Sequence, residues 1–240
     1  MDGTDKKYTY EEFLEIIKTL RGENGCPWDK VQTHESLKPC MTEEAAELLA
    51  SIRIYEQTGN PENMIEELGD VLLQVVMHAE IASEEGLFTM ADVVDEVSRK
   101  MVRRHPHVFG AGSADTPEEV LTNWDEIKKE EKKDKEWVES PLREIPRELP
   151  ALTRAAKVLK KADKYYGQGS TYEQDVEALQ ESVDALRACA PDDYSKELEQ
   201  ILADMLMRLS DIARIGKISH EQALTDRIED LIDKYEKAKC

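Results

Sequence analysis

The chain has 240 residues with 52 acidic and 32 basic side chains, so its formal net charge is −20 at pH 7. This length allows one or two domains with a sizeable hydrophobic core. A surface this acidic does not suit a nucleic-acid backbone, and no stretch is apolar and long enough to cross a bilayer, so we expect neither a nucleic-acid nor a membrane partner.

Helical patterns account for most of the first half of the chain. Thr9 and Glu12 form a capping-box pattern, which predicts a helix that continues to about Leu20. A polar loop is expected over residues 22–34, and Gly59-Asn60-Pro61 is typical of one helix ending and the next beginning. The remaining helices are predicted over residues 41–57, 61–85, 89–105 and from Thr116 through Trp124 into a lysine- and glutamate-rich tail.

The predicted helix over residues 61–85 is apolar on almost every side. Met64, Leu68 and Val71 form one stripe, while Leu73 and Met77 lie opposite. A helix of this kind usually lies at the centre of its bundle, where buried charges need partners.

The second half of the chain is also predicted to be helical, and a proline-rich segment separates it from the first half. Helices are predicted near residues 150–166, 172–189, 195–214 and 220–238. Three prolines between Glu139 and Pro150 cannot lie within one helix. We therefore expect an all-α protein of two tandem helical bundles, the first of four-helix type, with domains over residues 1–139 and 150–240 and a linker over residues 140–149.

The N-terminus and the cysteines indicate a cellular compartment. No apolar segment follows the first charged residues, so no secretory signal is visible. Four widely spaced cysteines show no paired spacing, which favours a reducing environment over disulfides or a zinc knuckle. We expect a cytoplasmic protein.

Two pairs of carboxylates stand out on neighbouring predicted helices. Glu44 and Glu47 are three residues apart on one helix, and Glu67 and Asp70 are three apart on the next. Residues at this spacing share a helix face, and the tight turn between the helices allows the two faces to meet. Converging carboxylates repel one another unless a cation lies between them, and hard oxygen ligands favour Mg²⁺ or Mn²⁺. Alternatively, such pairs are ordinary solvated glutamates, and the spacing alone leaves both interpretations open.

Four sequence blocks together resemble the MazG family of nucleoside triphosphate pyrophosphohydrolases. The family resemblance runs in order across about residues 8–135, and it includes both carboxylate pairs. The blocks are Glu23-Asn-Gly-Cys-Pro-Trp-Asp-Lys-Val-Gln-Thr-His34, Glu43-Glu44-x-x-Glu47, Glu66-Glu67-Leu-Gly-Asp70 and Arg103-Arg-His-Pro-His-Val-Phe109.

The resemblance implies a dimeric all-α enzyme that splits a nucleoside triphosphate into the monophosphate and pyrophosphate with Mg²⁺. The family's metal-binding and catalytic carboxylates then fall on Glu44, Glu47, Glu67 and Asp70. We expect the metal cluster to polarise the phosphate oxygens and one carboxylate to orient a water for in-line attack. Glu43 and Glu66, beside the motif positions, are expected to point outward.

The resemblance also assigns substrate-binding residues. It places phosphate ligands at Lys100, Arg104 and Lys128 and a base-stacking ring at Trp124. Without the resemblance, Lys100 and Arg104 would offset a helix dipole, and Trp124 would anchor its helix to the bundle. Trp28 lines the base pocket or pins its loop to the core, and the sequence does not separate these roles.

Other residues near these blocks have plainer interpretations. Arg103 lies on a different helix face from Lys100 and Arg104 and is expected to form a surface ion pair. His105 and His107 lack a third ligand nearby, so a structural turn is favoured over a zinc site.

The second half resembles a further MazG module that has lost its acidic motifs. Ala178 and Glu181 align with the first carboxylate pair, with Glu177 as an alternative to Ala178, and Ile201 and Asp204 align with the second. Two carboxylates of four hold Mg²⁺ poorly, so we predict a catalytically inactive bundle. Two further possibilities stay open for the whole protein: a narrow-specificity relative directed to dUTP, dCTP or phosphoribosyl-ATP, and a non-catalytic acidic scaffold or nucleotide sensor.

Overall fold

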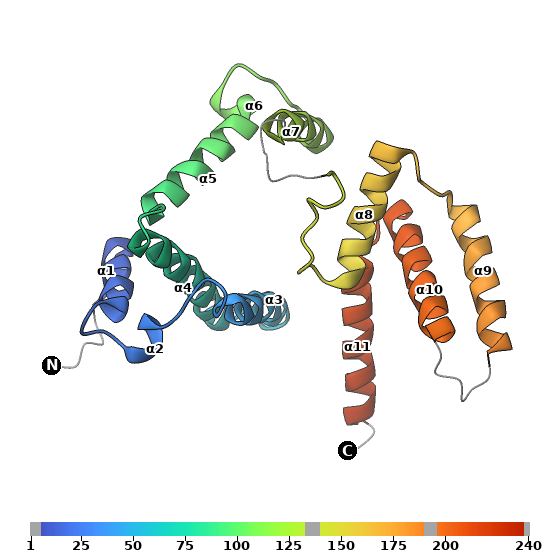
Figure 1. Ribbon diagram of the computed structural model, residues 1–240, viewed down its shortest axis with the longest axis horizontal. Helices are drawn as coiled ribbons and strands as arrows, with labels where there is room; N and C mark the ends of the chain where they lie inside the picture. The colour runs from blue at the N-terminus through green and yellow to red at the C-terminus, as the bar shows by residue number, and fades with distance from the viewer. Residues whose placement is uncertain (1–5, 133–139, 190–195, 238–240) are drawn as a thin grey trace. The chain divides into compact units, whose positions relative to one another are not determined.

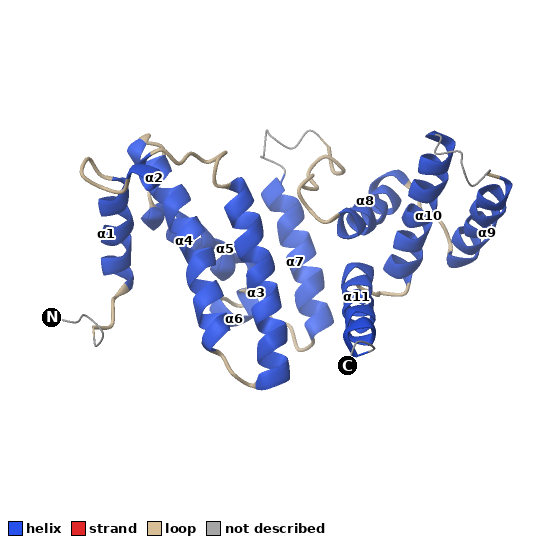
Figure 2. Cartoon of the chain, turned by 90° about the horizontal axis from the view of Figure 1, so that it is seen from below, coloured by secondary structure: helices blue, strands red, loops and turns tan. Residues whose placement is uncertain are grey.

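The computed structural model describes residues 6–132, 140–189 and 196–237. These residues form eleven helices and no strand (Figure 1 and Figure 2), which confirms the all-α fold. The helices are α1 (Tyr10–Arg21), α2 (Pro27–Lys30), α3 (Lys38–Thr58), α4 (Glu62–Glu84), α5 (Met90–Arg104), α6 (Pro106–Phe109), α7 (Pro117–Lys132), α8 (Ala151–Tyr166), α9 (Tyr172–Ala188), α10 (Lys196–Ile215) and α11 (His220–Lys237).

Local capping interactions place several of these helix ends where the sequence predicts them. The Thr9 hydroxyl accepts a hydrogen bond from the backbone N–H of Glu12, whose carboxylate accepts one from the Thr9 N–H. Thr89 caps α5 in the same reciprocal way with Asp92. Gly59 ends α3 in the left-handed conformation at φ 71°, where a side chain would be strained.

Two short helices were not expected from the sequence. Helix α2 lies within the predicted polar loop, and α6 follows directly after α5. Both begin with a proline, Pro27 and Pro106 respectively. Proline is tolerated at the first helical position because the N–H that it lacks has no partner there, so a proline that closes one helix can open the next.

The chain divides into two compact units, residues 1–127 and 128–240, with the division inside α7. The predicted end of the first domain at residue 139 lies outside the described residues. The domain boundaries that the sequence indicates therefore stay a prediction. In the part of the chain that the structure describes, no helix has the length and apolar character needed to span a membrane.

The first unit is built on an antiparallel hairpin of α3 and α4, with α1 and α5 packed against α4. Its core lies around the C-terminal half of α4, where Val76, Met77 and Ile81 meet Ile17 and Leu37. The prediction that this helix is central holds for this half. Nearer its N-terminus, Ile65, Leu68 and Leu72 are exposed, because no described helix of the same unit covers them.

A buried arginine ties three elements of this core together. Arg21 at the end of α1 forms a two-bonded ion pair with Glu84 of α4, at 2.8 and 2.7 Å. The same guanidinium donates to the backbone carbonyls of Asp29 and Gln32. The loop that carries α2 is thereby held against α1 and α4.

The second unit contains α8 to α11, with α10 between α8 and α9. Its interior includes a hydrogen-bonded polar group: the Ser170 hydroxyl lies 2.8 Å from Asp175 and 2.7 Å from Asp211. Both aspartates are buried, and Arg214 forms an ion pair with Asp211. Burial opposes ionisation, but the hydrogen bonds from Arg214 and Ser170 prevail and lower the pKa of Asp211.

Candidate metal and substrate site

Three of the four predicted carboxylates meet between α3 and α4. Glu44 of α3 and Glu67 and Asp70 of α4 each offer an oxygen, and these oxygens all lie within 4.8 Å of one another. Helical spacing places Glu67 and Asp70 on one face of α4, and the hairpin brings Glu44 opposite them. Glu47, one turn further along α3, is exposed and lies outside this acidic cluster.

Burial and mutual charge repulsion make the acidic cluster electrostatically unfavourable without a cation. Glu67 is only 9% exposed, and Asn63 donates a hydrogen bond of 2.9 Å to its Oε1. Its Oε2 is buried and has no hydrogen-bond partner among the described residues. Desolvation and then the charge of Asp70, Glu47 and Glu67 raise the pKa of Glu44.

The chemistry of the acidic cluster fits a divalent metal ion. It offers hard oxygen ligands without a thiolate or imidazole, which favours Mg²⁺ or Mn²⁺ over zinc. The unpartnered oxygen of Glu67 would coordinate a bound cation, and the cation would offset the repulsion between the three carboxylates. Of the residues that the structure describes, no group in the second unit brings three potential ligands together in this way.

The predicted phosphate ligands of α5 lie in its last two turns. Lys100 and Arg104 are both half-buried. Lys100 lines a cavity of about 360 Å³ with Phe88, Val93 and Val97. The predicted role of both residues in phosphate binding stays a prediction.

Trp124 packs against the turn that follows α5. Its ring meets the imidazole of His105 edge-on, with centroids 5.0 Å apart. His105 in turn pairs through Nδ1 with the Met101 carbonyl at 2.6 Å, and its ring lies 5.6 Å from that of His107. His105 therefore lies at the junction of α5 and α6, His107 lies within α6, and Trp124 contacts this junction.

The other two predicted substrate residues lie on α7 and α2. Lys128 follows Trp124 by one helical turn and is the first residue of the second unit. Trp28 lies on α2 and is 58% exposed. An aromatic ring this exposed is not needed by the core of its own unit, so it is available to a ligand.

Sequence reasoning missed a polar stripe on α4 beyond the acidic cluster. Gln74 and His78 continue the face of Glu67 and Asp70 at helical spacing. Gln74 is 6% exposed, and its buried Oε1 has no hydrogen-bond partner among the described residues. The His78 imidazole contacts that of His34 through their Nδ1 atoms, which are 2.8 Å apart. The helical spacing of residues 67, 70, 74 and 78 could have indicated this polar stripe from the sequence.

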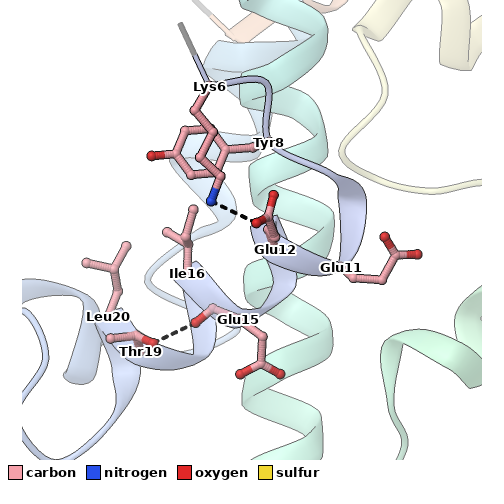
Figure 3. A pocket seen from close by; sticks show the side chains of 8 residues that line it. All are labelled: Lys6, Tyr8, Glu11, Glu12, Glu15, Ile16, Thr19 and Leu20. Carbon is pink, nitrogen blue, oxygen red and sulfur yellow. Dashed lines mark hydrogen bonds and ion pairs between the residues drawn. The ribbon is translucent and has the colours of Figure 1, made fainter. Parts of the chain in front are cut away.

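A separate shallow cavity lies beside α1 (Figure 3). It has a volume of about 480 Å³ and is lined mainly by the α1 residues Glu11, Ile16 and Leu20 with Tyr8 from the preceding segment. Lys6 and Glu12 form an ion pair of 2.8 Å across it. None of the predicted site residues lines this cavity.

Comparison with known proteins places these features among nucleotide hydrolases. Residues 32–109 match the model of the MazG nucleotide pyrophosphohydrolase domain, a range that includes the acidic cluster, Lys100 and Arg104. The nucleoside triphosphate pyrophosphohydrolase/pyrophosphatase MazG of Thermotoga maritima is 38% identical over 228 residues, which cover 95% of this chain and 84% of that protein. The nucleoside triphosphate pyrophosphohydrolase of Escherichia coli strain K12 is 39% identical over 208 residues, covering 85% and 77%.

A further relative is considerably longer than this chain. The uncharacterized protein YabN of Bacillus subtilis is 45% identical over 227 residues. The match covers 92% of this chain but only 45% of YabN, so the chain spans less than half the length of that protein.

Proposed function

The chain belongs to the MazG family of nucleotide pyrophosphohydrolases, and from this premise we propose that its first unit hydrolyses nucleoside triphosphates, in a Mg²⁺-dependent reaction, to the monophosphate and pyrophosphate. The observation that carries the proposal is the acidic cluster of Glu44, Glu67 and Asp70. The unpartnered buried oxygen of Glu67 supports it, because a carboxylate left in this state is costly unless it binds a cation.

The three carboxylates of the acidic cluster would hold the metal, with Glu47 as a fourth candidate from the adjacent turn of α3. A bound Mg²⁺ polarises phosphate oxygens and offsets the charge that develops on them. Asn63 orients Glu67 by donating to its Oε1, and Oε2, which has no hydrogen-bond partner among the described residues, would be available to bind the ion.

The substrate contacts rest on the family resemblance and on chemistry. Lys100 and Arg104 would bind phosphate oxygens, because guanidinium and ammonium groups form strong charge-assisted hydrogen bonds with them. Lys128 is proposed as a further phosphate ligand on the basis of the family resemblance alone. Trp28 is the better candidate for base stacking, since Trp124 already packs against His105.

A homodimer is the expected assembly. Apolar residues along the α3–α4 hairpin are exposed in the single chain, including Leu49 at 70%, Ile65 at 67% and Leu68 at 51%. Exposed apolar patches of this kind mark protein interfaces, and a second copy would cover them. We also expect a cytoplasmic location, because Cys26, Cys40 and Cys189 are free thiols.

The proposal is tested by measuring pyrophosphate release from a panel of nucleoside and deoxynucleoside triphosphates with Mg²⁺. Glu67→Ala should lower kcat/KM by at least about 100-fold, because it removes a metal ligand. Glu66→Ala, which changes the exposed neighbouring glutamate, should leave the rate within about twofold.

Each outcome decides between the alternatives. No release from any nucleotide by the wild-type protein would favour the scaffold or sensor. Release from a single nucleotide would favour a narrow-specificity relative. Equal rates for Glu67→Ala and the wild type would remove the acidic cluster from the reaction.

A further inference from the structure

The second unit contains a cavity lined by three arginines. Its volume is about 540 Å³, and Arg143, Arg147 and Arg154 all contribute to its wall. Ile145 and Val158 supply an apolar part of the same wall. Among the described residues that line this arginine cavity there is no carboxylate.

This concentration of positive charge contrasts with the rest of the protein. The whole chain has a formal charge of −20, yet α8, on which Arg154 lies, carries five basic side chains and one acidic one, Asp163. The three arginines concentrate positive charge along the wall of this cavity. The local field therefore favours a negatively charged ligand.

Arg154 adds a second, independent observation. Its Nε atom is buried and has no hydrogen-bond partner among the described residues. A buried cationic donor without an acceptor costs more than a neutral one, because burial removes its water and supplies nothing in return. An anion within the cavity would supply the missing acceptor.

The wall of the arginine cavity is held in place by contacts outside it. Lys161 donates to the Pro141 carbonyl at 2.8 Å and to the Glu144 carboxylate at 2.6 Å. Ile145 is only 4% exposed, so it anchors the same segment by burial. The segment over residues 140–149 therefore packs on α8, and the cavity that it forms is organised before any ligand arrives.

We propose that the arginine cavity binds a small phosphorylated molecule. Guanidinium groups match phosphate oxygens in geometry as well as charge, which favours arginine over lysine at such sites. The cavity is too small for a polymer, and its apolar wall suits the organic part of a nucleotide or sugar phosphate. This site goes beyond the proposed function: it lies outside the residues that match the MazG domain and uses none of the proposed catalytic or substrate residues.

The test is isothermal titration calorimetry of the full chain with pyrophosphate and with AMP as separate probes. EDTA is present throughout, so the metal site is empty and turnover cannot contribute. We expect at least one probe to bind the wild type, and Arg154→Gln and Arg147→Gln each to weaken that binding by about tenfold or more. Arg147 is exposed, so its substitution does not threaten folding, and circular dichroism checks the fold of both variants.

Two control variants identify the site. Arg227→Gln makes the same change at an exposed arginine of α11 and should leave the affinity unchanged. Lys100→Ala removes a proposed phosphate ligand of the first unit, so it tests whether a probe binds there instead of in the arginine cavity. Absence of binding to the wild type, or loss of binding in Lys100→Ala but not in Arg154→Gln, would overturn the proposal. Because no hydrolysis is measured, these outcomes are independent of whether the proposed activity is correct.

Discussion

The imidazoles of His34 and His78 lie nearly parallel, 7° from coplanar orientation, with their Nδ1 atoms 2.8 Å apart. His34 belongs to the loop before α3, and His78 is a half-buried residue of α4. At this distance one Nδ1 donates a hydrogen and the other accepts it, so the two atoms share one proton. A second proton at this contact would break the hydrogen bond and place two positive charges together.

The histidine pair predicts a stability that depends on pH. Burial, and then the neighbouring His34, lower the pKa of His78. Protonation therefore favours the unfolded state, so the stabilisation is present above the unfolded pKa near 6.5 and is lost as the pH falls through that value towards the folded pKa. We expect the Tm of the wild type to decrease as the pH is lowered from 7.5 to 5.5.

His78→Gln should reduce this fall in Tm, as measured by circular dichroism across the same pH range. His220→Gln, which removes an imidazole from the second unit, is the control and should keep the wild-type pH dependence of the first unit. The same pH slope for His78→Gln and for the wild type would contradict this account.

The contacts of the buried Arg21 predict that lysine cannot replace it. Arg21 donates to Glu84 through two nitrogens and to two backbone carbonyls, geometry that a single ammonium group cannot reproduce. Arg21→Lys should lower the free energy of unfolding by about 2 kcal/mol, measured by urea denaturation.

Arg99→Lys provides the matched control for this substitution. Arg99 forms an exposed ion pair with Asp95 within α5, and exposed pairs contribute little to stability. The urea midpoint of this variant should equal that of the wild type. An equal midpoint for Arg21→Lys would mean that the three-way contact of Arg21 does not stabilise the first unit.

The acidic cluster predicts opposite effects of one substitution with and without metal. Glu67→Gln keeps the hydrogen bond with Asn63 and removes one of three mutually repelling charges. Without metal, its Tm should exceed that of the wild type by a few degrees. On addition of Mg²⁺ the wild type should gain stability by ligand binding, whereas Glu67→Gln should gain little.

Differential scanning fluorimetry with EDTA and with Mg²⁺ measures both effects. Glu66→Gln removes a neighbouring exposed charge and should respond to Mg²⁺ as the wild type does. If Mg²⁺ raises the Tm of Glu67→Gln as much as that of the wild type, the ion does not bind at the acidic cluster.

The loss of the acidic motifs in the second unit predicts that Asp204, one of its two remaining motif carboxylates, is dispensable for turnover. Asp204 is exposed, and Ile201 stands where a second ligand would be needed. Asp204→Ala should leave kcat and KM for nucleoside triphosphates within about twofold of the wild type. A large loss of turnover in this variant would show that the second unit takes part in catalysis.

The sequence by itself determined the longer helices and part of the site, because both follow from local physics. Capping at Thr9 and Thr89 and the left-handed Gly59 depend on neighbours within a few residues. The shared face of Glu67 and Asp70 follows from helical periodicity alone. The family could also be identified from the sequence, because its motifs are short segments in a fixed order.

Only the tertiary structure decided which carboxylates meet. Glu44 joins Glu67 and Asp70, whereas Glu47 lies outside the acidic cluster although it is only one turn further along α3. The same holds for the contact of His34 with His78, which joins residues 44 positions apart. Helical periodicity says which residues share a face, but which face meets which is decided by the burial of side chains from distant segments.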